Sequence, residues 1–402
     1  MKIWKKNLYV VFFAQMIVVT GMTFVIPFLP FYVKELGITN MEQAARWSGW
    51  LMGAPALALI IVSPLWGSLA DRVGRKPMIV RAMFGGAICV FMMPLATNIY
   101  QLLFILILQG TLAGTIAACT ALVSASSPSR KMGFSLGLLQ TGFFLGNFLG
   151  PLLGGILADV LGFQNSFRIT AALLFIAGWL IIFLVEEKFT PSVREKQTIL
   201  FKKTIALFFN NRQLFIMFFL LFLVQFSVRI IIPIFPLYIE TILSNPKIIF
   251  TFTGLMFAIT GLMSAFSSIN VGKLIEKKPS KSLLTISLLG TGFFFLLHAF
   301  VTTTTQLILL RVGLGLFYGA IIPIANTIIS LSTPSQDRGK VFGIANSTTF
   351  LGNILGPISG GFIVSAFSLP AVFVFTGSIL FLSGFILPIA IKQTEKTSLE
   401  KV

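Results

Sequence analysis

A short charged loop is the first place where this sequence could do chemistry. It reads GSLADRVGRKP over residues 67–77 and lies between two long apolar runs. Glycine supplies the backbone freedom that a tight turn needs. A carboxylate at a helix end can hold an arginine and can also face the positive end of a neighbouring helix. We therefore predict a conformational latch formed by Gly67, Asp71, Gly74, Arg75 and Lys76. The alternative is a solvated basic turn that serves only the membrane topology.

Two arginines lie inside apolar runs, where ionisable side chains are expensive and often functional. Arg229, in the run VQFSVRIIIPIFP, is expected to face a cavity and bind an anionic or carbonyl-bearing substrate. The alternative is a structural arginine that bonds backbone carbonyls or extends outward to the membrane surface. For Arg311 we favour a structural role, in which it pairs with carbonyls or polar neighbours. A proton carrier needs a group that titrates as its solvation changes. The candidates for coupling are Asp71, Asp159 and Arg311, with His298 as a further one.

Other polar and adaptable side chains also fall inside the apolar runs. Amides there either line a cavity or join helices by hydrogen bonds, whereas methionine and phenylalanine can form an adaptable apolar wall. The residues expected to line a substrate cavity are Gln15, Met22, Gln109, Gln140, Phe144, Gln225, Arg229, Asn326 and Asn346.

Metal and enzyme chemistry find little support. The chain has one histidine and two cysteines, too few for a metal site, and Cys89 and Cys119 are expected to be small core residues. No nucleophile is grouped with a base and an orienting residue. We expect no cofactor and no catalytic activity, so a membrane-embedded enzyme or receptor remains only as an alternative from another class.

The elements that must position these residues are membrane-spanning helices. The chain has 402 residues, 56% of them hydrophobic and only 10% charged, against about 25% charged in soluble domains. Its mean hydropathy is +0.95. Runs of about 20 apolar residues can cross a bilayer. We predict an all-α polytopic protein with twelve spans near residues 8–33, 44–69, 77–97, 100–124, 135–160, 166–185, 213–241, 247–273, 281–301, 305–331, 341–367 and 369–392.

The net charge of +18 follows from membrane topology. Sorting Lys and Arg by predicted loop gives 24 on the side of both termini, four on the other side and two within spans. The positive-inside rule then places both termini in the cytoplasm. The basic residues are expected to contact lipid headgroups of the inner leaflet, and no nucleic acid is expected.

The sequence is an internal duplication. A glycine pattern in the fifth span returns 206 residues later in the eleventh: Gly137, Gly146, Gly150, Pro151, Gly154 and Gly155 match Gly343, Gly352, Gly356, Pro357, Gly360 and Gly361. Glycines on one face let helices approach closely, and a proline permits a bend. We divide the chain into six-helix bundles at 1–188 and 213–402, joined by a cytoplasmic loop at 189–212. Parallel repeats of this kind are one transporter plan, and a channel is the alternative.

The loop at 67–77, the twelve spans and the six-plus-six repeat resemble the major facilitator superfamily along the whole chain. The glycine pattern of the fifth span is similar to the signature of its drug:proton antiporter branch. This resemblance implies two pseudo-symmetric bundles, alternating access and proton-driven export. Members of the branch usually carry an arginine in the fourth span, four residues before a glycine; here Leu106 stands at that position before Gly110, while Arg311 and Gly315 keep the spacing in the tenth span.

The resemblance implies a plasma-membrane exporter of small, largely apolar compounds that uses protons and works as a monomer. The alternative is a specific transporter of one metabolite or siderophore. None of the twelve acidic residues lies at the middle of a predicted span, and cationic drugs usually need a buried carboxylate. We therefore also expect that the protein transports neutral or anionic substrates.

Overall fold

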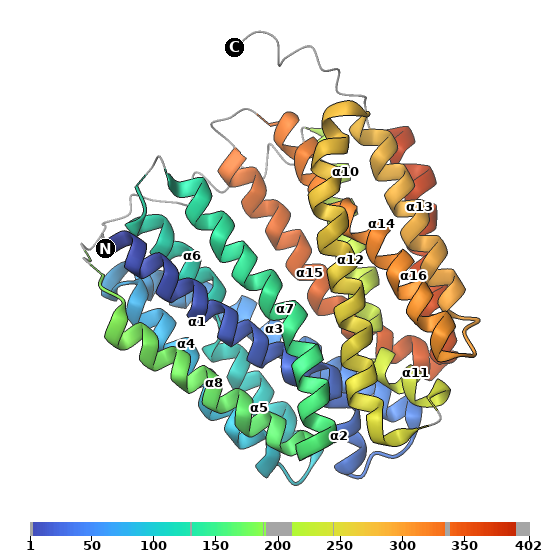
Figure 1. Cartoon of the computed structure of the whole chain (residues 1–402), viewed down its shortest axis with the longest axis horizontal. Coiled ribbons are helices and arrows are strands. Elements are labelled where there is room, and N and C mark those ends of the chain that lie inside the picture. Colours follow the sequence, from blue (N-terminus) through green and yellow to red (C-terminus); the bar gives the residue numbers. More distant parts are fainter. Residues whose placement is uncertain are drawn as a thin grey trace. The chain divides into compact units, whose positions relative to one another are not determined.

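A computed structural model of the chain describes residues 3–128, 131–187, 189, 211–243, 245–333 and 338–390. These residues form helices joined by short turns, with no β-strand among them (Figure 1). They include 12 stretches long and apolar enough to cross a membrane. The prediction of an all-α protein with twelve spans is confirmed. The predicted central loop, 189–212, lies almost entirely outside the described residues.

The residue contacts divide the chain into two units. Unit 1 is Met1–Val193 together with Phe235–Ala258. Its helices are α1 (Ile3–Val25), η1 (Ile26–Phe28), α2 (Leu29–Glu35), α3 (Met41–Val73), α4 (Arg75–Met92), η2 (Met93–Leu95), α5 (Ile99–Leu112), α6 (Thr115–Ser126), α7 (Met132–Leu161), α8 (Phe163–Leu184), α11 (Phe235–Ile242), η4 (Pro246–Ile248) and the start of α12 (Ile249–Lys277). In unit 1 we call the side of the N-terminus the near side and the opposite side the far side.

Unit 2 is Arg194–Ile234 together with Ile259–Val402. Its helices are α10 (Arg212–Ile231), the rest of α12, α13 (Ser280–His298), α14 (Thr304–Leu331), α15 (Arg338–Ala366) and α16 (Leu369–Ala390). The two units do not coincide with the two sequence repeats, because residues 235–258 belong to the second repeat but lie in unit 1. The predicted bundle boundaries at 188 and 213 stay a prediction.

The duplication seen in the sequence is also present in the helix contacts. α1 packs on α7 and α8 in unit 1, as α10 packs on α15 and α16 in unit 2. Thr170 donates a hydrogen bond to the Gly21 carbonyl at 3.0 Å, and Thr376 donates to the Ser227 carbonyl at 3.1 Å. Donor and acceptor of the second bond each lie 206 residues after those of the first. The two repeats therefore share a side-chain hydrogen bond as well as the order of their helices.

The fourth span is broken. α5 ends at Leu112, and α6 begins at Thr115 after Gly114, whose φ of +120° few residues other than glycine adopt. Backbone groups freed by a break inside a membrane must find other partners. Two side chains on neighbouring helices supply them, as described below.

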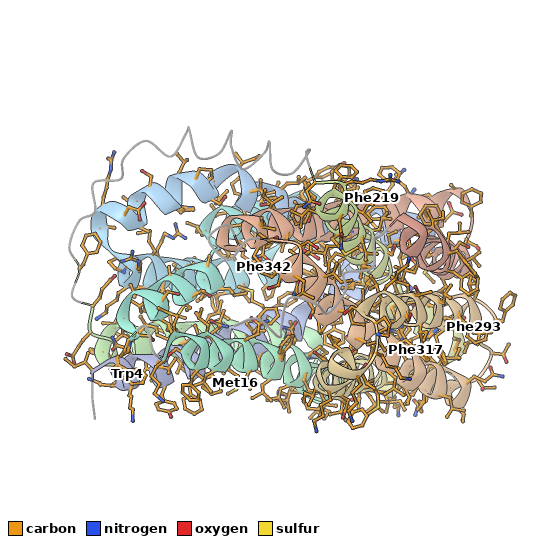
Figure 2. The ribbon with its side chains drawn as sticks, turned by 90° about the horizontal axis from the view of Figure 1, so that it is seen from above. Trp4, Met16, Phe219, Phe293, Phe317 and Phe342 are labelled. Atoms are coloured by element: carbon orange, nitrogen blue, oxygen red, sulfur yellow. The ribbon has the colours of Figure 1, made fainter. Side chains whose placement is uncertain are left out.

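Buried apolar side chains hold unit 1 together, and apolar side chains also cover the outside. One buried cluster includes Phe24, Phe28 and Leu102, and another includes Leu8, Met83 and Leu174. Phe219 and Phe293 of unit 2 keep about half of their surface exposed, at 48% and 49% (Figure 2). Such an apolar exterior suits a protein whose surroundings are lipid.

Candidate functional site

The near-side turn between α3 and α4 is a single residue. α3 continues to Val73 and α4 begins at Arg75, so Gly74, with φ +100°, makes the whole reversal. The positive φ of Gly74 agrees with its expected place in the turn, while its part in a latch stays a prediction. Gly67 does not contribute to the turn: it lies inside α3, because the helix runs further toward the loop than the sequence indicated.

Glu187, which follows α8, fixes the start of α4. Its carboxylate accepts hydrogen bonds from the backbone N–H of Arg75 at 2.9 Å and of Lys76 at 2.7 Å. The Lys76 ammonium donates to the carbonyls of Ile182 and Val185. A carboxylate at a helix N-terminus satisfies orphan amides and complements the helix dipole. The predicted latch thus includes an acid that we had not assigned to it, while Asp71 lies in the last turn of α3.

Three glycines of the α7 pattern lie against α1. A Cβ on Gly146 would come within 2.7 Å of Val19 Cβ, and one on Gly154 within 2.7 Å of the Phe24 carbonyl oxygen. A Cβ on Gly150 would overlap the hydroxyl of Thr23, which donates to the Gly146 carbonyl at 3.1 Å. This glycine face therefore packs one helix against another within unit 1. Gly137, by contrast, has open space around it.

The second copy of the pattern repeats this packing in unit 2. A Cβ on Gly352 would come within 2.7 Å of the Phe226 amide nitrogen, and one on Gly356 within 2.7 Å of Arg229 Cβ. A Cβ on Gly360 would come still closer to the Ile230 carbonyl oxygen. Both repeats thus use glycines for close contact between their first and fifth spans.

Other residues of α7 contact the segment 235–258 on the far side of unit 1. A Cβ on Gly155 would overlap the Phe250 carbonyl oxygen, and one on Gly254 would overlap the Pro151 carbonyl oxygen. Asp159 accepts hydrogen bonds from the amides of Phe250 at 3.2 Å and Thr251 at 2.7 Å. The structure therefore places Asp159 at the first turn of α12.

Charged residues surround this far-side contact. Lys34 Nζ lies 2.6 Å from Glu240 Oε2. Burial raises the pKa of the neighbouring Glu35, and a hydrogen bond with Gln164 acts in the opposite direction. The far side of unit 1 is thus joined by an ion pair as well as by close backbone packing.

The predicted cavity residues divide into two groups. Gln15 and Gln225 are only 2% and 8% exposed, and Gln15 donates to the Leu139 carbonyl at 3.0 Å, which is a contact that joins helices. Gln109 donates to the sulfur of Met22 at 3.3 Å, so these two side chains meet between α1 and α5.

The second group lies on exposed helix faces. Gln140 and Phe144 are exposed on one face of α7, and Asn346 is exposed on α15, whereas Asn326 on α14 is half-buried. Asn147, one turn beyond Phe144, is exposed too and donates to the Phe143 carbonyl at 2.9 Å. Polar side chains exposed within a span usually face a bundle interior or water, not lipid. These faces of α7 and α15 are the best candidates for contact with a substrate.

Arg229 is half-buried in α10 and is oriented by α15. Its Nε donates to Asn353 Oδ1 at 2.9 Å. Asn353 belongs to the repeated motif, one residue after Gly352, so the close packing of α10 and α15 brings the two side chains together. A guanidinium held through Nε can still offer its two terminal nitrogens to an acidic or carbonyl group.

Arg311 and His298 lie deeper in unit 2. Arg311 is 4% exposed in α14, and His298 is fully buried at the end of α13. The His298 ring stacks on Phe373, and its Nδ1 donates to the Phe294 carbonyl at 2.6 Å, because a carbonyl can only accept. The structural role favoured for Arg311 stays a prediction.

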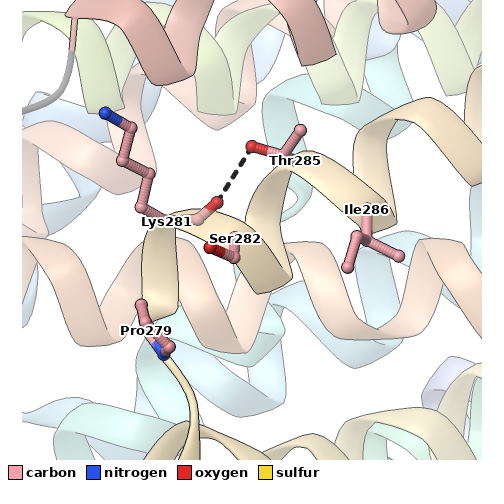
Figure 3. A pocket seen from close by; sticks show the side chains of 5 residues that line it. All are labelled: Pro279, Lys281, Ser282, Thr285 and Ile286. Carbon is pink, nitrogen blue, oxygen red and sulfur yellow. Dashed lines mark hydrogen bonds between the residues drawn. The ribbon is translucent and has the colours of Figure 1, made fainter.

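No group of three metal-binding side chains occurs in the part of the chain that the structure describes. A small pocket is lined by Pro279, Lys281, Ser282, Thr285 and Ile286 near the start of α13 (Figure 3). All five residues come from one stretch of chain, where Thr285 bonds back to the Lys281 carbonyl. None of them is a predicted site residue, so this pocket has no part in the candidate site.

Comparison with known proteins decides the family. A family model described as Major Facilitator Superfamily matches residues 11–278 and 217–401. The chain belongs to the major facilitator superfamily. Multidrug resistance protein MdtG of Salmonella schwarzengrund (strain CVM19633) is 35% identical over 377 residues, which cover 94% of this chain and 93% of that protein. MdtG of Salmonella arizonae shows the same identity and coverage.

Solved structures of superfamily transporters share the fold. The nucleoside transporter NupG is 17% identical and has a TM-score of 0.76, with 98% of this chain and 100% of that chain covered. A bacterial homolog of the human lysosomal transporter Spinster, in an inward-facing and unoccupied conformation, is 14% identical and has a TM-score of 0.77, with 97% of this chain and 96% of that chain covered. At such low identity the likeness shows the fold alone, and it agrees with the predicted superfamily fold.

Arg81 is a residue of this superfamily member that sequence reasoning missed. The charge count placed it on the cytoplasmic side although it falls within the predicted span 77–97, and the structure places it inside the third span, Arg75–Leu95. Its guanidinium stacks on Trp66 at 3.6 Å and donates to the Ala113 carbonyl at 2.9 Å, while Trp66 donates to the Thr111 carbonyl. Arg81 and Trp66 thus bond the carbonyls freed by the break in the fourth span.

Proposed function

We propose that this member of the superfamily exports small, largely apolar compounds from the cytoplasm in exchange for protons, by alternating access. The observation that carries the proposal is the extent of the likeness to MdtG, which is named a multidrug resistance protein: 35% identity over 94% of the chain. Only 6% of the chain lies outside a likeness of that extent. The protein acts as a carrier and not as an enzyme.

The polar faces of α7 and α15 are the proposed contact surfaces for the substrate. Gln140 and Asn346 are exposed on these helices within runs that are otherwise apolar. Phenylalanines lie beside them, such as Phe144, which is 58% exposed. Apolar walls with a few polar groups are typical of sites that bind drug-sized molecules, and this mixture supports broad specificity.

Substrate charge separates the proposal from its alternative. Arg229 offers a cation, and no acidic residue lies at the middle of a predicted span. A carrier without a buried carboxylate binds cationic compounds poorly, because nothing offsets the loss of their hydration. The alternative function, a specific transporter of a neutral or anionic metabolite or siderophore, rests on the same observation.

Proton coupling is proposed to pass through Asp71, Asp159 or Arg311. Asp71 and Asp159 are carboxylates at the ends of α3 and α7, where solvation can change when a side opens. Arg311 is buried and would act as a fixed cation that disfavours a proton on a neighbouring group. We further propose a monomer in the inner membrane with both termini in the cytoplasm, as the positive-inside rule predicts.

A resistance assay tests the proposed function. The gene is expressed in a host that lacks its own pumps, and growth is measured with cationic dyes, neutral antibiotics and anionic antibiotics. Export of several unrelated neutral or anionic compounds supports a multidrug carrier, whereas protection against one compound supports the specific transporter. Strong dye export that no acidic substitution abolishes would contradict the argument from charge.

A further inference from the structure

The two repeats cap the helix after their first span in different ways. In unit 1, Asn40 caps its own helix: its side-chain oxygen accepts from the amides of Glu42 at 2.9 Å and Gln43 at 3.0 Å at the start of α3. The residue 206 positions later is Pro246, which has no side-chain acceptor. Asn245 is adjacent, but its oxygen accepts from Lys247 in η4. Asn245 therefore caps η4, which leaves the first turn of α12 to be capped by another residue.

Asp159 supplies that cap from another helix. Its Oδ1 accepts from the Phe250 amide at 3.2 Å and its Oδ2 from the Thr251 amide at 2.7 Å, which are the second and third residues of α12. Amides in this position have no partner within their own helix. A carboxylate also complements the positive end of the helix dipole, and bonds to an ionised acceptor are stronger than neutral ones.

Glycines on both helices allow the cap to reach its amides. Gly155 is one turn before Asp159, and Gly254 is one turn after Phe250. Each lies directly against the backbone of the other helix: Gly155 against the Phe250 carbonyl and Gly254 against the Pro151 carbonyl. A side chain at either position would separate the helices and withdraw the carboxylate from the amides.

The cap lies over an aromatic cluster on the far side. The Phe250 ring packs edge-on against Phe28, with centroids 5.0 Å apart, and against Phe31, with centroids 5.1 Å apart. Phe28 is 2% exposed. The capped turn of α12 thus covers apolar side chains that would meet water if α12 moved away from α7.

We propose that Asp159 is a positioning residue that holds the far side of the transporter closed by capping α12. This inference rests on the proposed alternating access, which requires the far side to open and close. α12 begins in unit 1 and continues through residues 259–277 of unit 2. The capped turn is therefore the start of a helix that connects the two units. Ser365, the counterpart of Asp159 in the other repeat, bonds within its own helix to Gly361, so the device belongs to one repeat only.

A labelling experiment in whole cells tests this proposal without requiring a known substrate. Cys89 and Cys119 are replaced by alanine, and Phe31→Cys provides a thiol beneath Phe250. The rate of its reaction with a membrane-impermeant maleimide reports how often the far side opens. The rate is compared among the parent, Asp159→Asn, Asp159→Ala and the control Glu42→Ala, which removes an exposed acid from the first turn of α3.

The proposal predicts that Asp159→Ala is labelled at least about tenfold faster than the parent. This factor corresponds to a loss of about 1.4 kcal/mol in the free energy that favours the closed far side. Asp159→Asn keeps one acceptor and should fall between them, and Glu42→Ala should match the parent. An unchanged rate in Asp159→Ala, or an equal rise in Glu42→Ala, overturns the proposal. If Asp159→Ala does not accumulate in the membrane, a parental rate in Asp159→Asn overturns it. A protein that exports nothing can still show the predicted labelling, so failure of the two proposals can be distinguished.

Discussion

Lys34 and Glu240 occupy the same position in the two repeats, 206 residues apart, and their side chains meet at 2.6 Å. Lys34 lies in α2 and Glu240 in α11, the short helices that follow the first span of each repeat. A duplication creates identical residues at such positions, which would repel one another if both were charged. Divergence to opposite charges has turned the symmetry-related pair into an ion pair on the far side of unit 1.

Reversing one charge of this pair should weaken far-side closure. Lys34→Glu or Glu240→Lys places like charges together, and we expect a change of roughly twofold to fivefold in the labelling rate of Phe31→Cys, since exposed ion pairs contribute below about 1 kcal/mol. The double exchange, Lys34→Glu with Glu240→Lys, should restore the parental rate. A double variant no better than the single ones would show that the pair does not act through charge.

Gly150→Ala should destabilise the protein, whereas Gly137→Ala should not. A methyl group on Gly150 overlaps the Thr23 hydroxyl, while Gly137 has nothing within 4 Å. Overpacking of this kind costs about 1–3 kcal/mol. The thermal transition of the purified protein in detergent measures the difference. Equal stability of the two variants would contradict the account of the α1–α7 crossing.

The near-side turn gives a prediction that separates stability from transport. Glu187→Ala removes the cap of α4 and should lower stability by about 0.5–2 kcal/mol. Asp71→Asn leaves the cap intact, and we expect it to impair export while the protein still inserts. Export and the amount of protein in the membrane are measured for both variants. Parental export by Asp71→Asn would remove the latch hypothesis for that residue.

Arg229 should select substrates by charge. Arg229→Gln loses a cation that can bond acidic groups, so KM for anionic compounds should rise about tenfold to a hundredfold, from about 1.5–3 kcal/mol per charged hydrogen bond. Arg229→Lys keeps the charge and should lose less. Neutral substrates provide the internal control, because their KM should change little. An equal rise for neutral and anionic compounds would indicate a structural arginine.

The twelve spans and the duplication could be predicted because membrane insertion and helix packing leave local signals. Apolar runs must be long enough to cross the bilayer, and the glycines of the pattern between Gly146 and Gly154 mark a close crossing without naming the partner. The partner follows only from the fold: α1 receives three of these glycines, while Gly155 turns toward α12.

The contacts that sequence reasoning missed join residues far apart in the chain. Asp159 and Phe250 are 91 residues apart, and Glu187 and Arg75 are 112 apart. In each case a carboxylate completes the N-terminus of a helix to which it does not belong, so no local capping pattern reveals it. Arg81 was missed for a related reason: it bonds carbonyls that are free only because the fourth span breaks at Gly114.

The most direct test of the proposed function is transport by the purified protein in proteoliposomes with an imposed pH gradient. The substrate is a neutral or anionic compound that the resistance assay has identified. Proton antiport predicts that the substrate accumulates against its own gradient on the side from which protons flow, and that a protonophore abolishes this accumulation. Transport at the same rate and to the same extent with and without the pH gradient would contradict proton-driven export.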